Sequence, residues 1–199
     1  VMGQDGRISS KFLHPGPGFG GSCFPKDTEA FAAVGRNNHN IMRTIEAAIK
    51  TNNAQKLRMV EKIKNLIGGD FKNKTIAILG LAFKPNTDDV RESASIEMIK
   101  SIKQNGGFVK AFDPVANDSM KIIFPDISYK NSWEEACEDS DGVVIMTEWN
   151  EFRGISLSHL KSLMKRPILL DTRNILDVKK LKDNNFIFDN VGHNLFYEN

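Results

Sequence analysis

The sequence predicts an α/β protein in which a helical segment is followed by a doubly wound parallel sheet. Residues 40–66 carry apolar side chains at helical spacing, and after Gly69 short apolar runs alternate with amphipathic stretches. Such alternation is typical of a parallel sheet that helices cover on both faces. We therefore expect a helical part over residues 1–69 and an α/β part over residues 70–199.

The helical part is expected to begin with a loop and to continue as two helices. Residues 1–27 are rich in Gly and Pro, which argues against a regular element there. A helical pattern starts at about Asp27, and Pro25 suits its first turn. A longer helix is predicted from about Asn40 to Leu66. Its apolar stripe predicts packing either on another chain or domain, and hence self-association, or on its own domain.

The α/β part is expected to alternate short strands with short helices. The predicted strands are runs of apolar residues, and they lie at Thr75–Gly80, Phe108–Phe112, Val143–Met146 and Ile168–Asp171. The predicted helices carry apolar residues on one face, and they lie at Ser93–Gln104, Ser132–Glu138 and Ser156–Met164. The order of these elements predicts that all strands are parallel.

The charge balance argues against nucleic acid or an anionic membrane as a partner. There are 27 Lys and Arg against 25 Asp and Glu, which leaves a net charge of +2. No run approaches the roughly 18 uncharged apolar residues of a membrane span, and residues 1–11 lack a signal-peptide core. The two cysteines form neither a disulfide framework nor a metal pair, which favours a cytoplasmic location.

The histidines give no sign of a metal site. They lie at positions 14, 39, 159 and 193, without ligand spacing to one another or to the cysteines, so we expect no zinc. The sequence also lacks a P-loop and a G-x-S-x-G elbow, which argues against the common NTPases and hydrolases.

The strongest chemical signal is the stretch GFGGSCFPKD at residues 18–27. Its three glycines allow close approach of the backbone to a ligand, and Pro25 starts a helix, so Cys23 should lie at a helix N-terminus with Lys26 nearby. Dipole and cation both favour the thiolate, which makes Cys23 a candidate nucleophile. The alternative is that a lone cysteine is a small buried apolar residue. We predict that structural role for Cys137, whose neighbours are acidic.

A second signal is the stretch GLAFKPNTDDVRESA at residues 80–94, after the first predicted strand. Ligands of open α/β sheets bind beyond such strand ends, and Lys84 and Arg91 are placed to hold phosphate. The G-x-G-x-x-G fingerprint is absent, which indicates a nucleotide other than a conventional dinucleotide. The alternative is a solvated charge cluster at residues 88–92. Asp113, after the next strand, is either a ribose contact or a turn residue, and we favour the turn.

Three stretches together resemble the UDP-glucose/GDP-mannose dehydrogenase family, and its UDP-glucose branch in particular. They are residues 18–27, 78–93 and 146–152, and the resemblance covers essentially the whole chain. It implies that residues 1–69 belong to the central, dimer-forming helical domain. Residues 70–199 would form the C-terminal, Rossmann-like UDP-binding domain. Because the chain does not begin with Met, we expect it to be the C-terminal half of a longer polypeptide, without the N-terminal NAD-binding half.

The resemblance also implies a reaction, the oxidation of UDP-glucose to UDP-glucuronate by two NAD in polysaccharide biosynthesis. Cys23 would form a thiohemiacetal and then a thioester, and Asp27 would assist water and proton transfer. Lys26 and Arg91 would contact NAD. The residues implied in substrate binding are Arg7, Phe12, Leu13, His14, Pro15, Gly16, Phe19, Gly20, Phe83, Lys84 and Arg173.

The family assignment carries two further expectations. The protein would be a cytoplasmic homodimer or a higher homo-oligomer, and this chain alone would be inactive. The alternatives are a non-catalytic module that binds nucleotide sugars and dimerises, or a dehydrogenase of another nucleotide sugar. The presence of Cys23, Lys26 and Asp27 together favours the enzyme, because a binding module needs no thiolate.

Overall fold

A six-stranded parallel sheet occupies the C-terminal part of the computed structural model, which describes residues 1–192 except for the side chains of residues 11 and 12. The sheet order is β3-β2-β1-β4-β5-β6 and every pairing is parallel, which confirms the predicted doubly wound sheet. The strands are β1 (Thr75–Leu79), β2 (Phe108–Phe112), β3 (Ser128–Tyr129), β4 (Gly142–Ile145), β5 (Ile168–Asp171) and β6 (Ile187–Asn190). The strand order reverses between β1 and β4, where open α/β sheets bind their ligands.

Helices cover both faces of the sheet because its central strands are apolar on both sides. In β1, Ile76 and Ile78 point into one core cluster, and Ala77 and Leu79 point into the other. The first cluster is covered by α3 (Ala94–Gln104) and α4 (Asn117–Ile123), together with the C-terminal half of α2. The second is covered by α5 (Trp133–Cys137), α6 (Asn150–Arg153), α7 (Leu157–Leu163) and α8 (Val178–Asp183).

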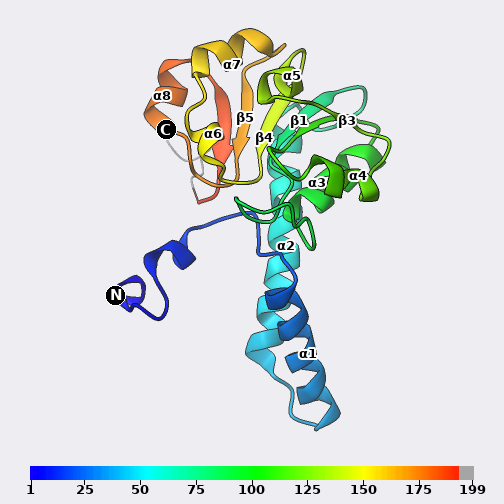
Figure 1. Ribbon diagram of the computed structural model, residues 1–199, viewed down its shortest axis with the longest axis vertical. Helices are drawn as coiled ribbons and strands as arrows, with labels where there is room; N and C mark the ends of the chain where they lie inside the picture. The colour runs from blue at the N-terminus through cyan, green and yellow to red at the C-terminus, as the bar shows by residue number, and fades with distance from the viewer. Residues whose placement is uncertain (193–199) are drawn as a thin grey trace.

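The N-terminal part consists of an arm and a helical hairpin (Figure 1). The arm contains two short 3-10 helices, η1 (Met2–Gln4) and η2 (Ser10–Leu13). In the hairpin, α1 (Cys23–Asn37) lies against the N-terminal half of α2 (Arg43–Leu66). Among residues 1–192, no helix combines the length and the apolarity needed to cross a bilayer.

Helix α2 joins the hairpin to the sheet. Met59, Val60 and Ile63 are buried in the first core cluster, so this half of the predicted stripe packs on the α/β part of the same chain, which is the other predicted domain. Close by, the Lys62 Nζ lies 2.6 Å from the Asp189 carboxylate of β6, where both side chains are largely buried. Because its C-terminal half is anchored on the sheet, helix α2 fixes where its N-terminal half lies relative to the sheet.

The sequence located the main elements and missed the short ones. The first helix begins at Cys23 rather than at about Asp27, because Pro25 needs no amide partner in a first turn and the turn extends back to Ser22. The second begins at Arg43 rather than Asn40. Seven elements were not predicted, and none is longer than seven residues: η1, η2, α4, β3, α6, α8 and β6. Cys137 is fully buried, which confirms its structural role, and burial raises its pKa.

Asp113 holds together the loops at the C-terminal edge of the sheet. One carboxylate oxygen accepts hydrogen bonds from the amides of Val115 and Ala116, which confirms the turn interpretation. The other oxygen accepts from the amides of Leu81 and Ala82 after β1, at 2.7 and 3.2 Å, and from the Trp149 indole at 3.1 Å. With 1% of its surface exposed, the side chain has its hydrogen bonds within the protein.

Replacing Asp113 with Ala is expected to lower the free energy of unfolding by about 3–5 kcal/mol, because several buried donors lose their acceptor. Urea unfolding measures the change. Asp118→Ala removes an exposed carboxylate from α4 and is expected to change stability by about 0.5 kcal/mol or less. Equal stabilities of the two variants would contradict the role of Asp113.

Candidate functional site

A glycine loop, residues 16–22, lies against the connection between β1 and α3. The Gly21 amide donates to the Arg91 carbonyl at 2.8 Å. A Cβ atom on Gly20 would lie 2.4 Å from the Glu92 carbonyl oxygen, and one on Gly21 would lie 2.8 Å from the Phe83 ring. Gly21 also has a φ of +85°, so only glycine satisfies both requirements at this contact. The two signals found in the sequence are therefore neighbours in space.

Cys23 follows the glycine loop directly and is the first residue of α1. The predicted position at a helix N-terminus is confirmed, and the side chain is exposed. Its Sγ lies 3.7 Å from the Ser22 hydroxyl. Lys26 and Asp27 follow one turn along the helix, on the same face, with 3.4 Å between Nζ and Oδ1. Thiol, ammonium and carboxylate thus share one exposed helix end.

Arg91 supplies a second cation near the thiol. Its guanidinium is fixed by Asp89 through two hydrogen bonds, at 2.9 and 2.8 Å. The hydrogen bond to Asp89 is the main cause of the raised pKa of Arg91, and the charge of Cys23 adds to it. The same contact lowers the pKa of Asp89. Of the predicted charge cluster, Asp89 and Arg91 form an ion pair, which orients Arg91 while 68% of its side chain remains exposed.

Arg173 lies just after β5 and links the loops that follow three strands. Its Nε donates to the Met146 carbonyl at 2.8 Å, and its Nη2 donates to the Phe83 carbonyl at 3.1 Å. Burial lowers the pKa of Arg173, and the Glu148 carboxylate opposes that effect from 3.1 Å. A Cβ atom on Gly16 would lie 3.2 Å from Nη1, so the glycine loop reaches this guanidinium.

The edge of the sheet between β1 and β5 therefore carries a base-sized aromatic ring and two cations. Phe83 is half-buried, and the exposed Lys84 ammonium lies 5.3 Å from the centre of its ring. Arg173 holds the main chain of the same loop. The fold thus gathers five of the predicted substrate residues at one edge: Gly16, Gly20, Phe83, Lys84 and Arg173. An aromatic ring beside two cations suits a nucleoside diphosphate.

Other predicted substrate residues precede Gly16 in the chain, and most of them belong to the N-terminal arm (Figure 1). Arg7 is exposed and pairs with Asp5 at 2.7 Å within the arm. Leu13, His14 and Pro15 are exposed as well. The side chain of Phe12 lies outside the described residues. For these five positions, as for the predicted residues at the edge of the sheet, the substrate role stays a prediction.

The structure also shows polar residues that the sequence did not single out. Glu148 lies beside Arg173, and Asn52 bonds to the backbone of Phe19. Glu148 lies two residues beyond the predicted strand Val143–Met146, within the stretch 146–152 that carries the family resemblance, whereas Asn52 looked like any polar residue of a helix. No group of three potential metal ligands occurs within residues 1–192.

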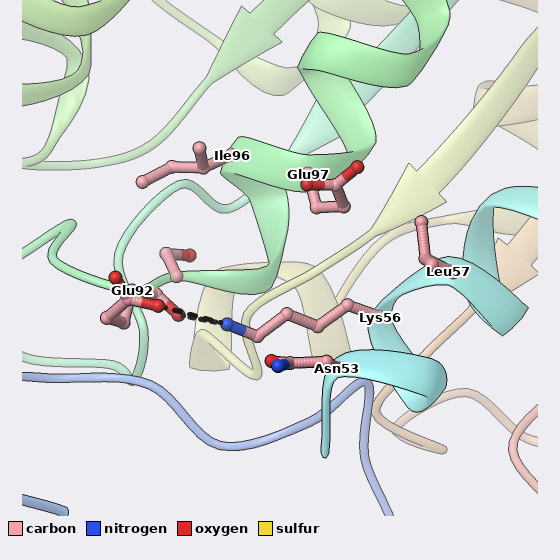
Figure 2. A pocket seen from close by; sticks show the side chains of 7 residues that line it. Asn53, Lys56, Leu57, Glu92, Ile96 and Glu97 are labelled. Atoms are coloured by element: carbon pink, nitrogen blue, oxygen red, sulfur yellow. Dashed lines mark hydrogen bonds and ion pairs between the residues drawn. The ribbon is translucent and has the colours of Figure 1, made fainter. Parts of the chain in front are cut away.

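A cavity of about 330 Å³ lies between α2 and the start of α3 (Figure 2). The Lys56 ammonium crosses it to Glu92, at 3.4 Å from the carboxylate. The side chains around it come from two helices and the loop before α3, and they are Asn53, Lys56, Leu57, Glu92, Ser93, Ile96 and Glu97. None of the predicted site residues lines this cavity.

Comparisons with known proteins match two regions of the chain to one family. The central domain of the UDP-glucose/GDP-mannose dehydrogenase family matches residues 1–54, and the UDP binding domain of that family matches residues 77–178. A UDP-glucose 6-dehydrogenase of Rickettsia bellii is 42% identical over 193 residues, which are 96% of this chain and 44% of the relative. One of Rhizobium meliloti is 40% identical over 191 residues, with the same coverage.

Solved structures agree with these matches. A UDP-glucose dehydrogenase from the archaeon Pyrobaculum islandicum superposes with a TM-score of 0.80 and 31% identity, over 94% of this chain and 41% of that one. The chain therefore spans less than half of the length of these relatives. The UDP binding domain of this family alone matches more than half of the residues of the chain, so the chain belongs to the UDP-glucose/GDP-mannose dehydrogenase family.

Proposed function

We propose that this chain carries the nucleophile and the UDP site of an NAD-dependent UDP-glucose 6-dehydrogenase. The observation that carries the proposal is the position of Cys23, exposed at the N-terminus of α1 and held by the glycine loop against the connection between β1 and α3. The names of the relatives support UDP-glucose as the substrate. The missing NAD-binding half would complete the enzyme. We further propose that the completed enzyme self-associates and lies in the cytoplasm.

The second oxidation explains why a thiol is needed. An aldehyde carbon releases hydride readily only after a nucleophile adds to it, so the Cys23 thiolate forms a C–S bond at the sugar C6 and gives a thiohemiacetal. Loss of hydride from that carbon gives a thioester. Water then breaks the C–S bond, releases the carboxylate and returns the thiol, with Asp27 one turn away to accept the proton of the water.

The charges around Cys23 fit the proposed cofactor. NAD supplies the hydride acceptor when it is bound, and its diphosphate is an anion. Lys26 and Arg91 present exposed cations near Cys23, from two different segments of the chain. They would hold the diphosphate side of the cofactor close to the thiol. The dinucleotide fingerprint is absent from this chain, so the remaining contacts belong to the missing half.

The alternative is a non-catalytic module that binds a nucleotide sugar and dimerises. Exposed apolar side chains on the hairpin, Phe31, Val34 and Ile41, support self-association under either function. An exposed cysteine with a carboxylate one turn away favours the enzyme, since binding alone needs neither group.

Titration of UDP-glucose into this chain tests the nucleotide site. We expect Lys84→Ala to weaken binding by about tenfold to a hundredfold, because a charge-assisted contact to phosphate is lost. Lys100→Ala removes an exposed lysine of α3 and is expected to bind as the parent chain does. GDP-mannose is expected to bind more weakly than UDP-glucose. Equal affinity of the two lysine variants would contradict the assignment of Lys84.

Turnover tests the nucleophile. With the NAD-binding half added, Cys23→Ala is expected to lower steady-state NADH formation by about a thousandfold or more, since the thiohemiacetal no longer forms. Cys137→Ala removes the buried thiol, which has no role in the proposed reaction, and therefore serves as the matched control. NADH formation by Cys23→Ala at the rate of Cys137→Ala would contradict the mechanism.

A further inference from the structure

Asn52 makes a contact that is unusual for a polar residue in the middle of a helix. It lies on α2, only 9% of its surface is exposed, and its side-chain amide pairs with the backbone of Phe19 in both directions. The Phe19 amide donates to Oδ1 at 2.7 Å, and Nδ2 donates to the Phe19 carbonyl at 3.1 Å. The side chain thus satisfies both backbone groups of one residue of the glycine loop.

The next turn of α2 extends this contact. Gln55 Nε2 donates to the Gly16 carbonyl at 2.9 Å, and Lys56 Nζ donates to the Glu92 carbonyl at 3.1 Å. Residues three and four apart share one face of a helix, so this face of α2 binds the glycine loop and the connection before α3 together. Figure 2 shows Lys56 reaching from α2 toward Glu92.

The fit at Asn52 also constrains the loop sterically. A Cβ atom on Gly18 would lie 2.8 Å from the Asn52 Oδ1, and Gly18 has a φ of +115°, which favours glycine. The loop is therefore fixed on one side by α2 and on the other by the hydrogen bond from Gly21 to Arg91. Cys23 follows two residues later.

We propose that Asn52 is a positioning residue for Cys23. Acting through the glycine loop, it sets the place of the thiol relative to Arg91 and to the nucleotide edge. The inference rests on the proposed function as far as turnover is concerned, but the contact itself is testable without it. Because a misplacement of about 1 Å can reduce a rate about a hundredfold, loss of the contact should act on kcat. KM for UDP-glucose should rise by a smaller factor than kcat falls, since Lys84 and Arg173 are not part of the contact, whereas Phe19 is a predicted substrate residue.

The test uses Asn52→Leu, which keeps the shape of the side chain and removes both hydrogen bonds. Asn53→Leu is the matched control, because Asn53 is exposed and its side chain has no hydrogen bond among the described residues. Gln55→Met removes only the bond to Gly16 and provides a second variant should Asn52→Leu fail to fold, which circular dichroism would reveal.

In this chain, we expect the Phe19 amide of Asn52→Leu to exchange its hydrogen at least about tenfold faster than in the control. We also expect iodoacetamide to alkylate Cys23 at least about threefold more slowly, because the sulfur loses its fixed position beside Arg91. Gln55→Met should change the alkylation rate in the same direction by a smaller factor. Equal alkylation rates in Asn52→Leu and Asn53→Leu would overturn the inference.

In the enzyme completed with its NAD-binding half, we expect Asn52→Leu to lower kcat at least about tenfold and to raise KM for UDP-glucose by a smaller factor. Faster exchange at Phe19 with unchanged kcat would overturn the positioning role. If the completed parent enzyme forms no NADH, the proposed function fails, and the alkylation rates alone decide the role of Asn52.

Discussion

The close approach of two glycines to the connection between β1 and α3 is the constraint on which the site depends. A single methyl group on Gly20 would meet the Glu92 carbonyl at 2.4 Å, so the two backbones are in direct contact. The hydrogen bond from Gly21 to the Arg91 carbonyl fixes their register. This contact brings Cys23 of the helical part near Arg91 of the α/β part, so the pair exists only when the two parts meet.

The rest of the fold supports that contact from two directions. The parallel sheet brings the loops after β1, β4 and β5 to one edge, where Asp113 and Arg173 bond to their main-chain groups. Helix α2 is anchored on the sheet by Ile63 and by the ion pair of Lys62 with Asp189. Because one rigid helix carries both this anchor and Asn52, the glycine loop is positioned relative to the sheet rather than only relative to α1.

Local patterns in the sequence were enough for most of the fold and for part of the site. The apolar runs at β1 and β4 are buried on both faces of the sheet, and their continuous apolar character made them recognisable in the sequence. Helix α8 has only one buried apolar residue, and β6 has only four residues, so neither was predicted. Cys23 and Lys84 were found because glycines and basic residues mark loops at element ends. Asn52 was missed because its partner is 33 residues away, and no local pattern encodes such a contact.

The most direct test of this account is amide hydrogen exchange at Gly21, measured in the parent chain and in Gly20→Ala. We expect a protected Gly21 amide in the parent chain and exchange at least about a hundredfold faster in the variant, because the added methyl group separates the two backbones. The amide of Ile78, in the middle of β1, should stay protected in both. A Gly21 amide that exchanges equally fast in the two proteins would contradict the central role of this contact.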